Sequence, residues 1–415
     1  MHFHAEVEAP ARRVAALVLE ILPRLEATYG VRVPSLNVVV HDANDAPNGS
    51  ALSFPYPLVE IRTASVDGAD SGPVDSWLRL VVTHELTHIV HLEQAGGLYG
   101  AFRHVFGRAP FLFPDALQPA WFIEGLAVRE ETRGTAFGRG RHALTKMVVD
   151  EAARSGQLAR MSQATLGLDL WPQGQAPYLF GSEFLAWLER GRGEDASRAV
   201  SRLHARALHP YLDSRSFRDA TGRDLKDLWR EFAAERQASL APAPSVNALT
   251  SRGAVQTTPR FSPDGKFIAY VSRGLKQAGE IRLMRADGTD DRRLCERLSG
   301  AGLSWSRDGA SLLFDETDTV ARFESRSDLY RVETTTGRRV RLTHGLRASD
   351  PDEGPAGPNG EPPEVIFVRR FEDRSELARL APDGAVRTLT QSEPGVEWSR
   401  PRFSPSGRST NSRWM

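Results

Sequence analysis

The stretch His84-Glu85-Leu86-Thr87-His88 lies inside a run from Asp75 to Gln94 whose spacing predicts a single helix. Residues four apart share one face of a helix, so His84 and His88 can point two imidazoles at one ion, with Glu85 beside them. Two nitrogen ligands next to a carboxylate are what a zinc-activated water requires. A five-residue motif with two free positions recurs by chance in unrelated proteins. The hypothesis of a zinc site therefore depends on a third ligand elsewhere in the chain.

Catalytic zinc takes three protein ligands and a water, so one ligand must come from outside this pentapeptide. The candidates within reach of the motif are His91, Glu93, His104 and Glu124. His91 follows His88 too closely on the same helix to complete a tetrahedron easily. Glu124 is favoured because it lies one turn into a second predicted helix, Pro119 to Glu131, where the adjacent Gly125 allows close helix approach.

Length and composition describe a globular chain of more than one domain. The 415 residues predict two or three domains, and a formal net charge of zero gives no reason to expect nucleic acid or an anionic membrane as a partner. The only cysteine, Cys295, excludes an internal disulfide and a cysteine-based zinc site. We find no apolar run of about 18 residues that could span a membrane, and no signal peptide at the N-terminus.

The half of the chain that contains the motif is predicted to have strands near its start and helices after the motif. Apolar spacing predicts a helix over 10–29, a strand over 36–40 and helices through 142–240, whereas the stretch 98–118 is expected to be loose. The segment Ala51 to Thr63 is predicted to be extended. Its prolines exclude a central strand and favour an edge strand that could pair with a peptide, with an ordinary hairpin as the equal alternative.

The periodicity changes from helical to alternating after a Pro-rich linker at 241–249. The region 250–415 contains a weak repeat in which a turn precedes an apolar strand. Its copies read Arg260-Phe261-Ser262-Pro263-Asp264-Gly265, Ser304-Trp305-Ser306-Arg307-Asp308-Gly309 and Arg402-Phe403-Ser404-Pro405-Ser406-Gly407. A period in the forties with about four short strands per unit is typical of propeller blades.

About three blades and a partial one fit into this region, whereas a closed propeller needs about 4–8. The last residues, Ser409 to Met415, are not expected to continue the strand that begins near Phe403. We therefore expect a propeller that is truncated in this sequence. The alternative is an open β domain of three units, which would leave strand edges exposed.

The helix motif together with Trp121-Phe122-Ile123-Glu124-Gly125-Leu126-Ala127 resembles the gluzincin metallopeptidases, in particular the peptidase MA-like relatives of the aminopeptidases. In that family a second helix with the pattern W-x-x-E-G-x-A carries the third zinc ligand, which corresponds to Glu124. Gln94 stands where a metzincin has its third histidine, so that subclass is excluded. The resemblance covers about residues 1–240 and implies an α+β zincin domain, with an insertion at 96–114 between the two motifs.

Two other positions in the first half of the chain extend this resemblance, and one segment of the repeat region separately resembles a second family. One segment is similar to the Y-x-x-G segment of the aminopeptidases: Pro177-Tyr178-Leu179-Phe180-Gly181. This similarity implies that the Tyr178 hydroxyl donates a hydrogen bond to the tetrahedral oxyanion. The alternative is a buried tyrosine at the start of a helix. Glu131 falls where the family helix carries another glutamate, which would at most support a ligand. Ser262-Pro263-Asp264-Gly265-Lys266 resembles TolB-type propellers, which favours an extracytoplasmic location.

These resemblances imply a zinc-dependent peptidase whose propeller binds a substrate or a protein partner. Zinc held by His84, His88 and Glu124 would activate a water and polarise the scissile carbonyl. Glu85 would take the proton of that water and pass it to the leaving amine, and Tyr178 would stabilise the oxyanion. The substrate would be a peptide or a protein, and the lack of a G-x-M-E-N segment favours an endopeptidase.

Two other interpretations stay open. In the first, the chain is a binding protein whose propeller recognises a partner, and residues 1–240 are a scaffold. In the second, the zinc is structural and Glu85 is incidental, although structural sites usually use four ligands, often cysteines. The presence of both ligand motifs, the glutamate base and the tyrosine in the expected order favours the enzyme.

Overall fold

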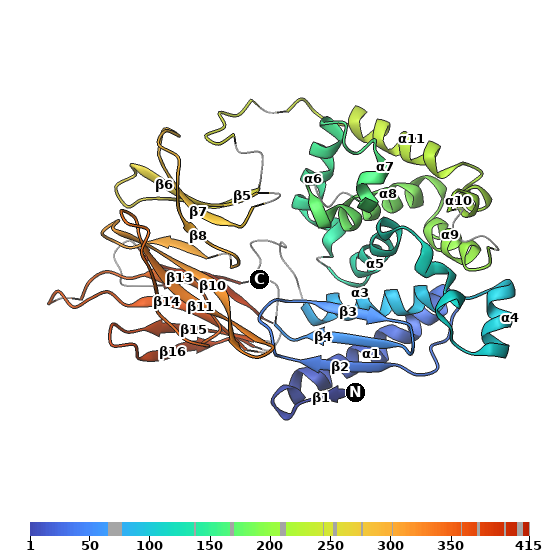
Figure 1. Cartoon of the computed structure of the whole chain (residues 1–415), viewed down its shortest axis with the longest axis horizontal. Coiled ribbons are helices and arrows are strands. Elements are labelled where there is room, and N and C mark those ends of the chain that lie inside the picture. Colours follow the sequence, from blue (N-terminus) through green and yellow to red (C-terminus); the bar gives the residue numbers. More distant parts are fainter. Residues whose placement is uncertain are drawn as a thin grey trace. The chain divides into compact units, whose positions relative to one another are not determined.

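The chain divides into two compact units, the first built around helices and one sheet and the second entirely of sheets (Figure 1). The first unit consists of Met1–His41, Asn48–Ile61 and Ser76–Ala243, and the second of Asp42–Pro47, Arg62–Asp75 and Pro244–Met415. The computed structural model describes residues 1–64, 77–136, 138–166, 170–207, 213–243, 245–251, 255–274, 277–300, 302–357, 359–371, 374–393, 396–404 and 410–414.

A four-stranded sheet, in the order β1-β2-β4-β3, lies in the first unit. Its strands are β1 (His2–Phe3), β2 (Asn37–His41), β3 (Gly49–Leu52) and β4 (Leu58–Arg62). Of the two alternatives for 51–63 the hairpin is confirmed, because β3 and β4 pair antiparallel; β3 is the edge strand of the sheet and β4 is internal. Pro55 and Pro57 lie in the connection between them, since proline cannot donate a ladder hydrogen bond.

Helices make up most of the first unit. Among the described residues they are α1 (Glu8–Tyr29), α3 (Trp77–Leu92), α4 (Gly97–Phe106), α5 (Ala120–Gly134), α6 (Ala143–Arg154), α7 (Met161–Leu166), α8 (Ala176–Arg192), α9 (Ala196–His204), α10 (Asp213–Thr221) and α11 (Leu225–Ala238). Short 3-10 turns are η1 (Ala5–Val7), η2 (Pro110–Leu112), η3 (Pro114–Leu117), η4 (Arg139–Arg141) and η5 (Gln173–Gln175).

The predicted helices over 10–29, 119–131 and within 142–240 are confirmed. The prediction of a loose stretch over 98–118 is wrong over its first half, where α4 forms, whereas 107–118 contains only the short turns η2 and η3. The helix of the motif ends at Leu92 instead of Gln94, and Asp75, where it was predicted to begin, lies outside the described residues.

Helix α3 is a core helix without an exposed face over most of its length. Every residue from Leu80 to His91 is buried. Apolar side chains such as Val82, Leu86 and Ile89 drive the burial of this helix in the core of the unit. The polar residues of the motif are therefore buried with it and require partners from neighbouring elements.

Helices α5 and α8 approach closely because glycines face each other at their crossing. A Cβ on Gly181 would lie 1.9 Å from the carbonyl oxygen of Trp121, and a Cβ on Gly125 would lie 2.6 Å from the carbonyl carbon of Gly181. The indole ring of Trp121 then packs edge-on against Phe184 of α8 and Trp229 of α11, with ring centroids 5.4 and 5.2 Å away. This aromatic cluster fixes the position of α5 and hence of Glu124.

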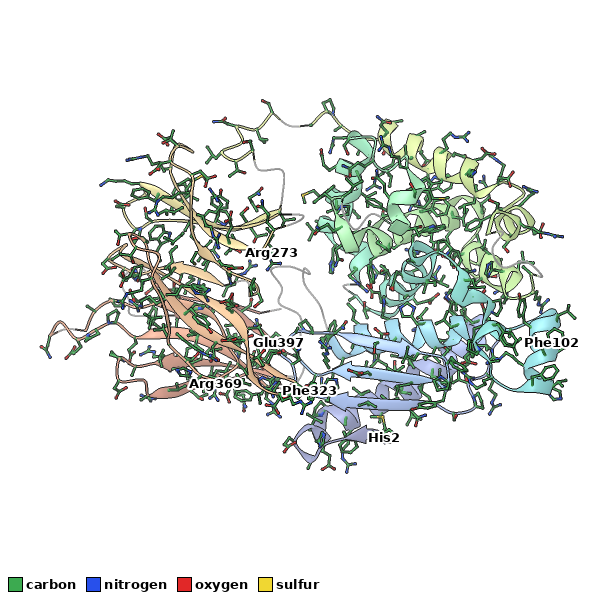
Figure 2. The ribbon with its side chains drawn as sticks, in the orientation of Figure 1. His2, Phe102, Arg273, Phe323, Arg369 and Glu397 are labelled. Atoms are coloured by element: carbon green, nitrogen blue, oxygen red, sulfur yellow. The ribbon has the colours of Figure 1, made fainter. Side chains whose placement is uncertain are left out.

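Helix α4 lies in the insertion between the two sequence motifs and exposes apolar side chains. Phe102 and its neighbours Leu98, Val105 and Phe106 are all exposed on this helix (Figure 2). An ion pair from Arg103 holds α4 to the chain just after α3. None of the described helices is both long and apolar enough to cross a bilayer.

The second unit contains sheets whose strands follow one another in sequence order. They are β5 (Val255–Phe261), β6 (Phe267–Arg273), β7 (Glu280–Arg285) and β8 (Arg292–Glu296); β9 (Leu303–Trp305), β10 (Ser311–Ala321), β11 (Glu324–Glu333) and β12 (Arg339–Arg341); β13 (Ala348–Glu353), β14 (Val365–Phe371), β15 (Arg374–Leu380) and β16 (Val386–Gln391); β17 (Trp398–Phe403) and β18 (Thr410–Trp414). In the described residues this gives three four-stranded antiparallel sheets and a two-stranded one, the arrangement of propeller blades. The expectation that the last residues would not continue the strand pattern of the repeat is wrong, because β18 follows β17 in the chain and pairs with it.

The repeated turn of the blades has a local cause. The Ser262 hydroxyl donates to Asp264 at 2.7 Å, and the following Gly265 takes a φ of 73° that glycine adopts without strain. The hydroxyl of Ser306 bonds Asp308 in the same way at 2.6 Å. The turn therefore forms from neighbouring residues, which explains why the repeat could be detected in the sequence.

Replacing Gly181 with alanine is expected to destabilise the first unit by about 1–3 kcal/mol, since the new methyl group would overlap a backbone oxygen of α5. Denaturant unfolding followed by circular dichroism measures this change. Gly191 lies in the same helix with no atom within 4 Å of its Cβ position, so Gly191→Ala should be neutral or stabilising by up to about 1 kcal/mol. Equal destabilisation by both variants would contradict the close helix contact.

Candidate metal centre

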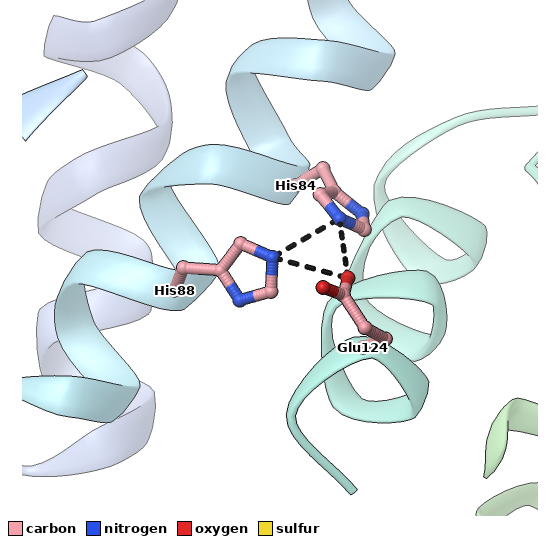
Figure 3. Close-up of side chains that lie close together, drawn as sticks. All are labelled: His84, His88 and Glu124. Carbon is pink, nitrogen blue, oxygen red and sulfur yellow. Dashed lines mark hydrogen bonds and ion pairs between the residues drawn. The ribbon is translucent and has the colours of Figure 1, made fainter. Parts of the chain in front are cut away.

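Three polar side chains from two helices converge on one point of the first unit (Figure 3). His84 and His88 come from α3, and Glu124 comes from the first part of α5. The Nε2 atoms of the two histidines are 3.1 Å apart. The Glu124 Oε2 atom lies 3.2 Å from Nε2 of His84 and 3.3 Å from Nε2 of His88.

The arrangement fits a zinc ion. Tetrahedral zinc with bonds of about 2.0–2.1 Å keeps its ligand atoms about 3.4 Å apart, and the three separations here are 3.1, 3.2 and 3.3 Å. Two imidazole nitrogens and one carboxylate oxygen are also a ligand set of catalytic zinc, which keeps its fourth position for a water. His84, His88 and Glu124 are thus brought together as the sequence predicted.

The structure gives the other candidate ligands different partners. Glu93 forms ion pairs of 2.5 Å with both Arg103 and Arg108. The Nε2 atom of His91 lies 2.9 Å from the Gln118 side-chain oxygen. Burial and the neighbouring His88 lower the pKa of His91 to about 3, so this ring is neutral and donates to Gln118. His104 is exposed on α4.

The electrostatics of the three residues favour a positive charge between the two rings. Burial alone would lower the pKa of His84, but hydrogen bonds to Glu124 and Glu131 raise it to about 9. Burial alone would raise the pKa of Glu124, yet hydrogen bonds from His84 and His88 hold it well below its usual range. Glu124 is therefore ionised, and a divalent cation between the two rings would satisfy its charge.

Glu85 is held against the edge of the sheet. It is 5% exposed, and a Cβ on Gly49 of β3 would lie 2.7 Å from its Oε1 atom and 2.5 Å from Val81. A side chain at position 49 would therefore press on the side chains of Glu85 and Val81. The sequence did not single out Gly49, because the contact joins two elements far apart in the chain.

Tyr178 lies beside the metal ligands, in the first turn of α8. Its ring stacks on the ring of His84, with centroids 6.0 Å apart and an interplanar angle of 23°. Burial and the negative charge of Glu124 raise the pKa of Tyr178 to about 12, so its hydroxyl keeps its proton. The close contact between Gly181 and α5 places this first turn next to Glu124.

Glu131 and Arg139 stand behind His84. The Glu131 Oε2 atom is 3.2 Å from Nδ1 of His84. Burial alone would raise the pKa of Glu131, but the charge of Arg139 and its hydrogen bonds lower this pKa to about 2. Sequence reasoning placed Glu131 near a ligand but missed Arg139. The sequence signal for Arg139 was the two glycines that flank it, Gly138 and Gly140. The sequence does not show that both glycines pack against Thr132 of α5.

Comparison with known proteins finds similarity only among solved structures. No family model and no curated protein matches the sequence. TolB from Acinetobacter baumannii is 23% identical over 40% of this chain and 39% of that protein, with a TM-score of 0.32. A TolB-like protein from Agrobacterium tumefaciens is 20% identical over 39% of this chain and 71% of that one, with a TM-score of 0.29. An acylaminoacyl peptidase from Pyrococcus horikoshii is 15% identical over 33% of this chain and 25% of that one, with a TM-score of 0.25.

The likeness to each of these structures is therefore partial, and the chain covers well under half of the first TolB protein. The description of the second unit as blade-like rests on the strand order of its own sheets.

Zinc is expected to stabilise the protein against thermal unfolding through these three residues. At about 100 times its dissociation constant, zinc that binds only the folded chain adds about 2.7 kcal/mol, which a melting curve with and without the metal detects. His88→Ala should abolish this increase. His104→Ala, which removes an exposed histidine that the sequence also offered, should keep it; loss of the increase in both variants would contradict the assignment.

Proposed function

We propose that the first unit is a zinc-dependent peptidase of the gluzincin type. The observation that carries this proposal is the convergence of His84, His88 and Glu124 at tetrahedral spacing. A buried carboxylate, Glu85, on the same helix and a tyrosine beside the ligands provide the remaining groups of that chemistry. A site that served only to stabilise the fold would have no use for these two groups.

Bound zinc would supply a Lewis acid that activates a water and polarises the scissile carbonyl. Glu85 acts as the general base that takes the proton of the attacking water and returns it to the leaving amine. The close approach of Gly49 limits the room for this carboxylate on the side that faces β3. Burial of the carboxylate also removes competing water.

Tyr178 stabilises the negative charge that develops on the carbonyl oxygen. Its pKa is raised to about 12 by burial and by the charge of Glu124, so the hydroxyl is a donor at neutral pH. A neutral donor aimed at a developing oxyanion is an efficient form of transition-state stabilisation. The stacking of its ring on His84 keeps the hydroxyl near the metal ligands.

The edge strand β3 favours a peptide substrate. It is the last strand of its sheet, pairs only with β4 among the described strands, and packs against α3 at Glu85. An extended peptide can add to such an edge through main-chain hydrogen bonds and would then pass beside the general base. We infer that the substrate is an extended peptide segment, which suits an endopeptidase.

The blades of the second unit are proposed to bind a substrate or a protein partner. The alternative, a binding protein whose first unit is a scaffold, makes a different prediction for the metal centre. In a scaffold, changing Glu85 would have no measurable consequence.

Glu85→Gln is expected to keep zinc and to lose hydrolysis, because the amide cannot accept the proton of the water. The loss in kcat should be about 100- to 10,000-fold, the usual contribution of a general base. Zinc content and cleavage of a quenched fluorescent peptide library are measured on the same preparation. Glu151→Gln, at an exposed position on α6, serves as the control and should leave both unchanged; an active Glu85→Gln protein would reject the mechanism.

Gly49→Ala is expected to lower kcat/KM by about 10- to 100-fold, since the added methyl group must displace Glu85. Zinc content should remain near that of the native protein. Ser50→Ala changes the adjacent, exposed residue of the same strand and should have no effect. Native kinetics in the Gly49 variant would show that β3 does not confine the base.

A further inference from the structure

Arg139 lies beside the proposed metal centre, and the chemistry above gives it no task. It begins η4, and its guanidinium bonds both oxygens of Glu131, with Nε 2.7 Å from Oε1 and Nη2 2.8 Å from Oε2. Its backbone N–H also donates to Oε1 at 3.2 Å. A two-pronged arginine–carboxylate pair of this kind fixes the plane of the carboxylate as well as its position.

Two glycines allow this approach. A Cβ on Gly138 would lie 2.3 Å from the Cα of Thr132, and a Cβ on Gly140 would lie 2.9 Å from the Thr132 hydroxyl. The chain on either side of Arg139 therefore packs directly onto the end of α5. Any other residue at position 138 would push the arginine away from Glu131.

The hydrogen-bonding roles around His84 follow from counting protons. The Arg139 Nη2 atom is 2.9 Å from Nδ1 of His84, but a guanidinium only donates. When Nε2 of His84 faces a metal, Nδ1 carries the proton and can donate only to Glu131, at 3.2 Å. The Oε2 atom of Glu131 then accepts from both neighbours, and Arg139 keeps it in the place that His84 requires.

Arg139 also contacts the tyrosine of the site. Its Cζ atom lies 5.0 Å from the centre of the Tyr178 ring, within the range of a cation–π interaction. The same ring stacks on His84. One guanidinium therefore touches the carboxylate behind a metal ligand and the ring proposed to carry the oxyanion donor.

We propose that Arg139 is a positioning residue of this centre: it fixes Glu131 so that His84 presents Nε2 to the metal, and it holds Tyr178 beside that ligand. This inference rests on the proposed function. Arginine is required at this position because a lysine, a single point charge, cannot hold both carboxylate oxygens. The role is local, since the contacts of the guanidinium that the structure gives are to His84, Glu131 and Tyr178.

The test compares three variants of the full chain: Arg139→Met, Arg139→Lys and Arg198→Met. Arg198 is the matched control, because it is similarly buried and donates at 3.0 and 2.8 Å to Glu130, the neighbour of Glu131 on α5, away from the metal ligands. Zinc affinity is measured by competition with a chromogenic chelator. The visible spectrum of the cobalt-substituted proteins reports the geometry around the metal.

Arg139→Met should weaken zinc binding by about 10- to 100-fold, the usual effect of losing a partner of a metal-bound histidine, and should shift the cobalt spectrum. Arg139→Lys, which keeps the charge and is used if the methionine variant does not fold, should weaken it by about tenfold. Arg198→Met should lower only the melting temperature.

The outcomes are separable. Native zinc affinity and an unchanged cobalt spectrum in a folded Arg139 variant overturn the positioning role and leave the proposed function intact. A matching loss of affinity in Arg198→Met also overturns it, because the effect would then be general destabilisation. A native protein that binds no zinc overturns the proposed function and this inference together.

Discussion

The first unit depends on the burial of polar groups along α3. Every residue from Leu80 to His91 is buried, and a buried polar group without a hydrogen bond costs about 1–3 kcal/mol. Neighbouring elements supply partners to several of these groups, whereas the Nδ1 atoms of His88 and His91 have no hydrogen-bond partner among the described residues. Helix α5 supplies Glu124 and Glu131 to His84, and η3 with the residue after it supplies partners to His91. The contacts that form the candidate metal centre therefore also hold α5 against α3.

Glycines set the distances on which this arrangement depends. Gly181 meets the backbone of α5, Gly49 lies over Glu85, and Gly138 packs on the end of α5. In each case a methyl group would fall within 3 Å of a neighbouring atom. These glycines are required because they have no side chain to fill the space between elements. Together they allow Tyr178, the edge strand β3 and Arg139 to lie close to α3 and α5. The site is therefore sensitive to substitutions that change no functional group.

The second unit follows a simpler principle, because its strands pair with their neighbours in sequence. Each described sheet is a meander, and its recurring turn is closed by bonds such as that from Ser262 to Asp264. Buried charge is also satisfied locally: Asp328 accepts hydrogen bonds from Arg341 and Thr343, both at 2.6 Å, on the strand beside it and in the turn that follows. Local contacts of this kind explain why the repeat predicted these sheets well.

The sequence by itself determined the elements whose signals are local: the helix of the motif, the helix of Glu124, and the strand repeat of the blades. It also indicated His84 and His88 as ligands, because a spacing of four on a helix defines a face, and Glu124 through the pattern of the second helix. Only the tertiary structure decided between the two interpretations of Ala51 to Thr63, brought Gly49 against Glu85 and brought Arg139 to Glu131. These outcomes depend on contacts between segments far apart in the chain, and no local pattern encodes the space that remains between them.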